Sequence, residues 1–311
     1  MLAEIHRLID VAQDWLWTYV NIGLLVGCAI FFTFRMRGIQ FRLFGDMVRQ
    51  MFRSGSVSGE PSGKKQISSF QAFIVALASR IGTGNLAGVA TAISVGGPGA
   101  IFWMWLMALL GAATAFVEST LAQLYKRRTG VGYYGGPAYY MRHGLHRRWM
   151  GVIFSVLMII TFGFANNAMQ SNTIALACLQ AFDVPLEWMG IVLCLLTMAV
   201  IFGGIQRIAH VSSAVVPVMA VAYLVITLYV MVTNYALVPS VLQLIVENAF
   251  GMSQVAGGTL GTIVMMGIKR GLFSNEAGEG SAPNAAATAE VTHPVKQGLV
   301  QALGVFVDTL V

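Results

Sequence analysis

The sequence predicts an all-α protein that crosses a membrane several times. Of its 311 residues, 57% are hydrophobic and only 10% are charged, whereas a soluble domain carries roughly 25% charged residues. The mean hydropathy is +0.72. Several apolar stretches are each close to the roughly 20 residues that a membrane-spanning helix needs. The net charge of +6 does not indicate a nucleic-acid-binding protein, because the basic residues cluster between the apolar runs.

Seven stretches of the chain are expected to form spanning helices. They cover residues 15–34, 70–95, 99–125, 150–179, 188–202, 211–232 and 258–289, and the last has a polar interruption. An eighth apolar run begins near Gly298 and continues to Val311. A shorter stretch, 241–250, has apolar residues at helical spacing and is expected to lie along the membrane surface.

Lysine and arginine are concentrated on one side of this predicted topology. That side carries Arg35, Arg37, Arg42, Arg49, Arg53, Lys64, Lys65, Lys126, Arg127, Arg128, Arg142, Arg147, Arg148, Arg207 and Lys296. The opposite side carries Arg7 together with Glu4, Asp10, Asp14, Asp183, Glu187 and Glu247. Cytoplasmic loops are enriched in Lys and Arg. We therefore expect a protein of the cell membrane with its N-terminus outside and its basic loops in the cytoplasm.

Two of the predicted helices are interrupted by the same polar pattern. The first break reads Arg80-Ile-Gly-Thr-Gly-Asn85-Leu-Ala87-Gly88, and the second reads Arg270-Gly-Leu-Phe-Ser-Asn275-Glu-Ala277-Gly278. A broken helix at membrane depth is tolerated only where it lines a protein-enclosed or water-filled cavity. Two breaks at corresponding positions indicate the binding site of a transporter. The alternative is a chance similarity between helices rich in glycine and alanine.

The predicted topology gives the two broken helices opposite directions. The first runs from the inside to the outside, and the second comes five spans later and runs back. Such elements are typical of inverted-topology repeats. We therefore expect an extracytoplasmic N-terminus (1–14), a peripheral transmembrane helix (15–35), a basic cytoplasmic loop (36–69), a first five-helix repeat (70–233), an extracytoplasmic connection (234–257) and the start of a second repeat (258–311).

The first break has the chemistry of a binding site for a zwitterion and a small cation. Gly82 and Gly84 permit a backbone that exposes peptide groups. Freed N–H groups at a half-helix N-terminus suit a carboxylate, and freed carbonyls suit a hard cation. Asn85 offers both an acceptor and donors. The alternative is a glycine-rich crossing where two helices pack closely.

The second break is more polar than the first, and its charges are expensive at membrane depth unless they are paired or hydrated. Arg80 and Arg270 are expected to pair with Glu276 or Glu279, as a gate or a strut. The alternative for Glu279 is that it has already reached the cytoplasmic surface.

Other polar residues lie inside the remaining apolar runs. Asn166 and Gln170 share one face of the fourth helix, and Gln170 is expected to contact a ligand, with interhelical hydrogen bonding as the alternative. Glu118 and Asp308 are intramembrane carboxylates that serve either proton coupling or structural hydrogen bonds. The five histidines and three cysteines form no metal-binding spacing, and no catalytic motif is present. The sequence therefore predicts a protein that is not an enzyme.

The motifs around the two breaks resemble the alanine or glycine:cation symporter family, also called sodium:alanine symporters. The resemblance is carried by Gly82-Thr-Gly-Asn-Leu-Ala-Gly-Val-Ala-Thr-Ala-Ile with Gly96-Gly-Pro-Gly-Ala-Ile-Phe-Trp-Met-Trp105, and by Ser274-Asn-Glu-Ala-Gly-Glu-Gly-Ser-Ala-Pro283. It implies a leucine-transporter-like inverted-repeat fold that works by alternating access. It also implies sodium-coupled uptake of alanine or glycine, with Na⁺ as coupling ion and no other cofactor.

The resemblance assigns roles to particular residues. Its substrate contacts fall on Thr83, Gly84, Asn85, Gln170, Ser274 and Asn275, and its cation-facing backbone carbonyls fall near Ala78 and Ile81. Because family members continue well beyond Val311, the chain is expected to be C-terminally truncated with an incomplete second repeat. Two alternatives to a symporter are a channel or facilitator, and an inactive or partner-dependent membrane fragment.

Overall fold

The computed structural model describes residues 2–53, 67–129, 132–251 and 259–310, and these residues are almost entirely helical. Five of the described helices are long and apolar enough to cross a membrane, namely His6–Arg35, Ser69–Gly96, Gly99–Leu124, Arg148–Phe182 and Gly204–Thr233. The helix Leu186–Ile201 is apolar but shorter. The prediction of an all-α polytopic membrane protein is thereby confirmed.

The N-terminal part of the chain contains α1 (Leu2–Trp15), a π-helical segment (Leu16–Asn21), α2 (Ile22–Arg35), α3 (Ile39–Arg42) and α4 (Phe44–Arg53). The first predicted repeat contains α5 (Ser69–Arg80), α6 (Thr83–Gly96), α7 (Gly99–Leu124), β1 (Arg127–Thr129), β2 (Gly132–Tyr134), α8 (Pro137–His143), α9 (Arg148–Met158), a π-helical segment (Ile159–Ala165), α10 (Asn166–Phe182), α11 (Leu186–Ile201) and α12 (Gly204–Thr233). A 3₁₀ turn (Tyr235–Leu237), α13 (Val238–Ala249), α14 (Leu260–Asn275), α15 (Ser281–Thr288) and α16 (Pro294–Leu310) follow. The expected N-terminal tail, 1–14, is thus helical from Leu2 and continuous with the first span.

The first polar pattern interrupts a helix where the sequence predicts it. The N-terminus of α5 is fixed by a capping box, in which Ser68 Oγ accepts from the Gln71 N–H at 3.1 Å and Gln71 Oε1 accepts from the Ser68 N–H at 3.0 Å. The helix ends at Arg80, and Ile81 and Gly82 are extended before α6 begins at Thr83. The Gly82 carbonyl then accepts the first bond of α6, from the Asn85 N–H at 3.2 Å.

The second polar pattern also interrupts a helix, between α14 and α15. Glu276 adopts a left-handed conformation with φ of 49°, and Gly278 and Gly280 have φ of 93° and 87°. Such backbone is accessible to glycine without a steric penalty. The side chain of Asn275 stabilises the turn, because its Oδ1 accepts from the Ala277 N–H at 3.0 Å.

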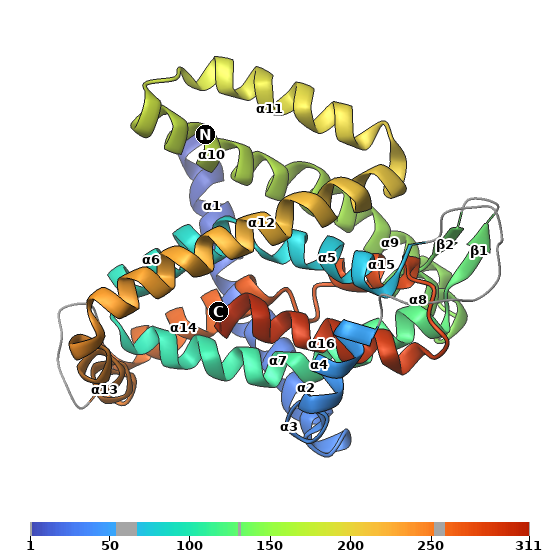
Figure 1. Ribbon diagram of the computed structural model, residues 1–311, viewed down its shortest axis with the longest axis horizontal. Helices are drawn as coiled ribbons and strands as arrows, with labels where there is room; N and C mark the ends of the chain where they lie inside the picture. Colours follow the sequence, from blue (N-terminus) through green and yellow to red (C-terminus); the bar gives the residue numbers. More distant parts are fainter. Residues whose placement is uncertain (1, 54–66, 130–131, 252–258, 311) are drawn as a thin grey trace.

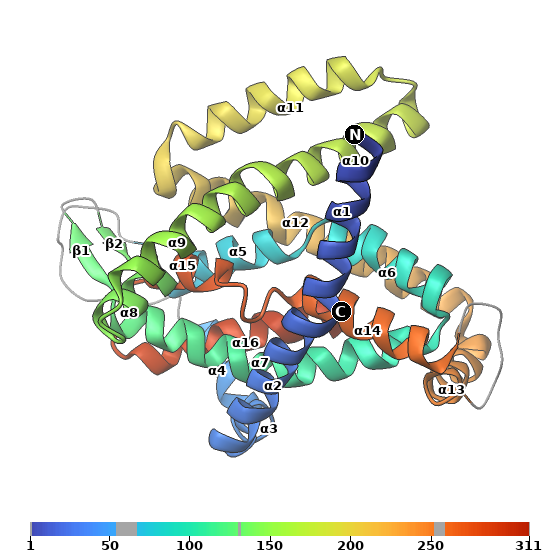
Figure 2. The ribbon, with the colours of Figure 1, turned by 180° about the vertical axis from the view of Figure 1, so that it is seen from behind.

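The two broken helices lie side by side and run in opposite directions. The half-helix α5 packs against α15, whereas α6 packs against α14, so the order of the halves along the chain is reversed. Both views show α6 and α14 at one end of the molecule and α5 and α15 towards the other (Figure 1 and Figure 2). The two breaks are thereby brought to the same level.

Helix α7 packs against both halves of the second broken helix and against α2, α13 and α16. Small side chains permit close approach here, and the buried core includes Ala108, Ala112, Ala115, Ala277 and Ala302. By contrast, α11 and α12 expose many large apolar side chains, and α11 lies at the edge of the molecule, away from α7 (Figure 1). Lipid is the appropriate solvent for such surfaces.

The closeness of the helices predicts which glycines tolerate a methyl group. In α14, a Cβ at Gly267 would lie 2.5 Å from the Ala100 carbonyl oxygen and 2.5 Å from Trp103 Cβ. We expect Gly267→Ala to destabilise the protein by about 1–3 kcal/mol through overpacking. At Gly27 in α2, a Cβ would meet nothing within 4 Å, so Gly27→Ala should leave stability unchanged or raise it. Thermal unfolding of both variants in one detergent tests this, and equal melting temperatures would contradict the packing described.

Candidate functional site

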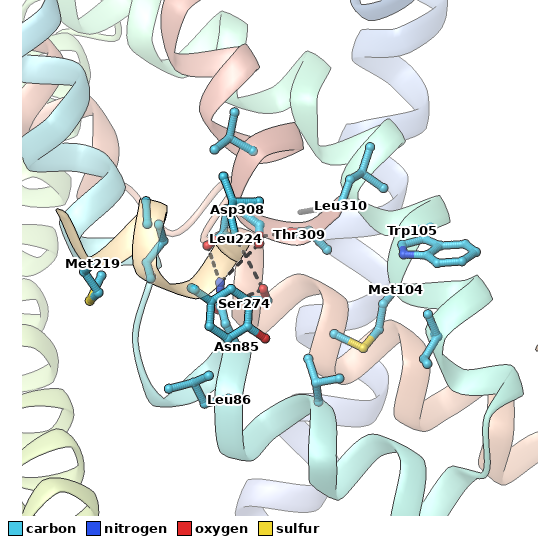
Figure 3. A pocket seen from close by; sticks show the side chains of 16 residues that line it. Asn85, Leu86, Met104, Trp105, Met219, Leu224, Ser274, Asp308, Thr309 and Leu310 are labelled. Atoms are coloured by element: carbon cyan, nitrogen blue, oxygen red, sulfur yellow. Dashed lines mark hydrogen bonds between the residues drawn. The ribbon is translucent and has the colours of Figure 1, made fainter. Parts of the chain in front are cut away.

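A polar cluster of Asn85, Ser274 and Asp308 lies where the two breaks meet, and we call it the junction cluster. Asn85 Nδ2 donates to Asp308 Oδ1 at 2.5 Å and lies 3.3 Å from the Asp308 carbonyl oxygen. Ser274 Oγ lies 3.1 Å from both Asn85 Oδ1 and Asp308 Oδ2, and its single hydrogen serves one of them at a time. Figure 3 shows the three side chains pointing toward one another.

Each member of the junction cluster comes from a different helix. Asn85 lies in the first turn of α6, Ser274 in the last turn of α14, and Asp308 near the end of α16. Ser274 is 2% exposed and Asp308 is 7% exposed. The cluster therefore joins both broken helices to α16 in a buried environment, where each polar atom depends on protein partners or on a ligand.

The junction cluster borders the cavity shown in Figure 3, which has a volume of about 320 Å³. The apolar part of its wall comes from side chains that include Leu86, Met104, Trp105, Met219 and Leu224. Ile81, at the end of α5, also lines it. A mostly apolar cavity with a few convergent polar groups is typical of a small-molecule site.

The junction cluster is rich in oxygen atoms. A carboxylate, an amide oxygen and a hydroxyl converge there, and hard cations prefer such ligands. In addition, the carbonyls of the last turn of α5, which contains Ala78, have no following helical turn to bond with. The N-terminal turn of α6, which contains Thr83 and Gly84, presents free N–H groups that suit an anion. The side chain of Thr83 lies outside the described part of the structure.

Gln170 lies on the other side of the first break. It belongs to α10, and a Cβ at Gly82 would lie 3.0 Å from Gln170 Oε1. Together with Asn166 and Phe273 it lines a second cavity of about 20 Å³, and Gly84 contributes to the same wall. The Phe273 ring lies against Gly84, where a Cβ would be 3.1 Å from the ring. The expected substrate residues therefore fall into two groups, on opposite sides of the break.

Asn275 and Arg270 do not line the larger cavity. Asn275 is fully buried, and its Nδ2 lies 3.3 Å from the Met107 carbonyl oxygen. With its bond to the Ala277 N–H, this side chain connects the turn after α14 to α7. Arg270 is partly buried on α14 and does not line either of these two cavities.

Arg80 and Glu276, which are expected to form an ion pair, each have hydrogen-bond partners of their own. Arg80 is 2% exposed, and its Nη1 donates to the Gln301 carbonyl at 3.2 Å. Glu276 accepts from Ser79 Oγ at 2.9 Å and from Ser281 Oγ. Glu276 thus connects the end of α5 to the start of α15.

The position of Asp308 in an apolar run predicts an intramembrane carboxylate but does not predict its hydrogen-bond partners. Asp308 and Asn85 are 223 residues apart, and no local pattern reports such a contact. The sequence did contain one usable signal. One face of α16 carries three buried polar residues, Gln297, Gln301 and Asp308. This face is hydrogen-bonded to α5 through Ser69 and Ala72, and to α6 through Asn85.

Comparisons with known proteins agree with the residue-level observations. Residues 2–311 match the sodium:alanine symporter family. The amino-acid carrier protein AlsT of Bacillus subtilis (strain 168) is 53% identical over 306 residues, which are 98% of this chain and 64% of AlsT. The probable sodium/glutamine symporter GlnT of the same organism is 50% identical over 307 residues, which are 99% of this chain and 63% of GlnT.

A third relative comes from an archaeon. The sodium/alanine symporter AgcS of Methanococcus maripaludis is 40% identical over 309 residues, which are 98% of this chain and 68% of AgcS. The chain therefore spans just under two thirds of the length of AlsT and GlnT. Because residues 2–311 match its family model, this multi-pass membrane chain belongs to the sodium:alanine symporter family, which is a family of transporters and not of enzymes.

Proposed function

We propose that this chain carries the binding site of a secondary active transporter that couples Na⁺ entry to uptake of a small neutral amino acid, alanine or glycine. The observation that carries the proposal is the junction cluster, which joins both broken helices to α16 beside a cavity of about 320 Å³. Membership of the family supports sodium and an amino acid as the transported species.

In this proposal, Na⁺ binds between the Asp308 carboxylate, Asn85 Oδ1 and the carbonyls of Ala78 and Ile81. A carboxylate that is 7% exposed at membrane depth is costly unless a cation neutralises it. The hydrogen-bond partners of the Asp308 carboxylate are the neutral side chains of Asn85, Ser274 and Thr309. Arg80 lies within electrostatic reach of Asp308, but its Nη1 donates to the Gln301 carbonyl. A bound cation supplies a positive charge in direct contact with the carboxylate.

The amino acid binds next to the cation. Its carboxylate faces the N-terminal turn of α6, at Thr83 and Gly84, where free N–H groups and the positive end of the helix dipole favour an anion. Ser274 is within reach of the same space, and Gln170 contacts the break from the opposite side. The Phe273 ring against Gly84 leaves little room between α6 and α14, which favours a small side chain.

The antiparallel packing of the two broken helices supports an inverted-repeat architecture and alternating access. The basic loops then lie in the cytoplasm and the N-terminus outside, in keeping with the positive-inside rule. AlsT and AgcS, whose names refer to an amino-acid carrier and to alanine, favour alanine over the glutamine named for GlnT.

The transport claim predicts uptake driven by a sodium gradient. Purified protein in proteoliposomes should accumulate radiolabelled alanine when Na⁺ is high outside, and a sodium ionophore should abolish the accumulation. Unlabelled glycine should compete with alanine, whereas glutamine should compete poorly. Alanine flux that is independent of the Na⁺ gradient and does not saturate would indicate a channel or facilitator instead.

The cation claim predicts that Asp308→Asn weakens Na⁺ binding at least about tenfold, because the amide removes the negative charge that faces the ion. Titration calorimetry with NaCl, against choline chloride, measures this directly. Glu187→Gln is the matched control, because it removes a carboxylate from the exposed first turn of α11 and should leave Na⁺ affinity unchanged. Equal Na⁺ affinity in Asp308→Asn and the wild-type protein would remove Asp308 from the site.

A further inference from the structure

Three glutamates gather at the second break, away from the larger cavity. Glu118 of α7 is 6% exposed and lies within electrostatic reach of Glu276 and of the backbone N–H of Gly278. Glu276 is 7% exposed. Glu279 lies within electrostatic reach of both Glu118 and Glu276. Glu276 and Glu279 also border the smaller cavity of about 20 Å³.

The groups that face these glutamates come from three further helices and supply little positive charge. Arg80 of α5 faces Glu118 and Glu276. Tyr140 of α8 lies within electrostatic reach of Glu118, and α10 contributes the neutral Asn166 and Gln170 to the smaller cavity. Three ionised glutamates and one guanidinium would leave a net charge of −2, and Arg80 is also within reach of Asp308. Glu118 and Glu276 are buried and Glu279 is partly buried, and such an excess of negative charge in a poorly hydrated place is unfavourable.

The hydrogen bonds of the glutamates differ. Glu276 Oε2 accepts from two hydroxyl donors, Ser79 and Ser281, which favours the ionised form of this carboxylate. Glu118 Oε1 is buried and has no hydrogen-bond partner in the described structure, and the same is true of Arg80 Nε and Nη2. A buried anion with an unpartnered oxygen is costly, whereas a protonated carboxyl group is neutral. A proton that offsets the excess negative charge of the three glutamates is therefore most favourable on Glu118 or on its neighbour Glu279.

A proton lowers this negative charge with the fewest ligands. Among the described residues, no group of three His, Cys, Asp or Glu side chains is arranged to hold a metal. A proton needs only one carboxylate oxygen. The smaller cavity, of about 20 Å³, is large enough for one water molecule, since a water needs roughly 10–15 Å³. Such a water would allow a proton to move between Glu279 and its neighbours.

We propose that Glu118 and Glu279 form a proton-binding site that holds at least one proton at neutral pH, separate from the junction cluster. The first break lies between the two: the junction cluster faces the larger cavity, and Glu279 borders the smaller one. The bound proton lowers the buried negative charge, so that Glu276 remains ionised and keeps its two serine donors, which connect α5 to α15. The protein then has two cation sites, one for Na⁺ and one for H⁺.

Infrared spectroscopy tests this proposal without reference to transport. A protonated carboxyl group has a C=O absorption that a carboxylate lacks. The purified wild-type protein should show this band at neutral pH and lose it on titration to alkaline pH. The band should weaken in both Glu118→Gln and Glu279→Gln and vanish in the double variant. It should persist in Glu187→Gln, which changes an exposed carboxylate, and in Asp308→Asn, which changes the junction cluster.

Absence of the band from the wild-type protein at neutral pH would overturn the proposal, and so would a double variant that retains it at full intensity. A band lost in Asp308→Asn and kept in both glutamine variants would place the proton at Asp308 and equally overturn it. Size-exclusion chromatography checks folding, and if the double variant does not fold, the two single variants decide. Sodium-driven uptake is measured separately, so failure of either proposal is distinguishable from failure of the other.

Discussion

The structure depends on one constraint: a polar group inside a bilayer must find its partner within the protein. Each break releases backbone N–H and carbonyl groups and introduces polar side chains at membrane depth. The two breaks meet this requirement together, because the broken helices pack antiparallel and bring Asn85 and Ser274 to the same carboxylate, that of Asp308. Neither broken helix alone offers these partners.

The surrounding helices follow from this arrangement. Helix α7 approaches α14 and α15 closely through small residues, and Gly267 and Gly271 lie against its backbone. Close packing brings Glu118 of α7 to the second break, and α16 supplies both Asp308 and the carbonyl that accepts from Arg80. The first break therefore lies between two polar regions of different composition. One has a single carboxylate among neutral donors, and the other has three carboxylates around one guanidinium.

Local patterns predicted much of this architecture. Apolar periodicity gave the long helices, and glycine with polar residues marked both breaks within the correct helices. What local patterns could not give were contacts between distant segments. The hydrogen bond between Asn85 and Asp308 depends on how α16 packs against α6. The bond between Asn275 Oδ1 and the Ala277 N–H depends on the turn at Glu276. Gln170 lies against Gly82 of the first break and lines the smaller cavity, whereas Asn85 lines the larger one. The sequence alone does not predict that these two residues line different cavities.

The central claim is that Na⁺ binds at the junction cluster with the amino acid directly beside it, and the thermodynamic linkage between the two ligands tests this claim most directly. Alanine affinity should be measured by calorimetry in the purified protein at increasing Na⁺, with choline keeping the ionic strength constant. The account predicts that saturating Na⁺ tightens alanine binding by the same factor by which saturating alanine tightens Na⁺ binding, because coupling between two sites is reciprocal. An alanine affinity that does not change with Na⁺ would contradict it.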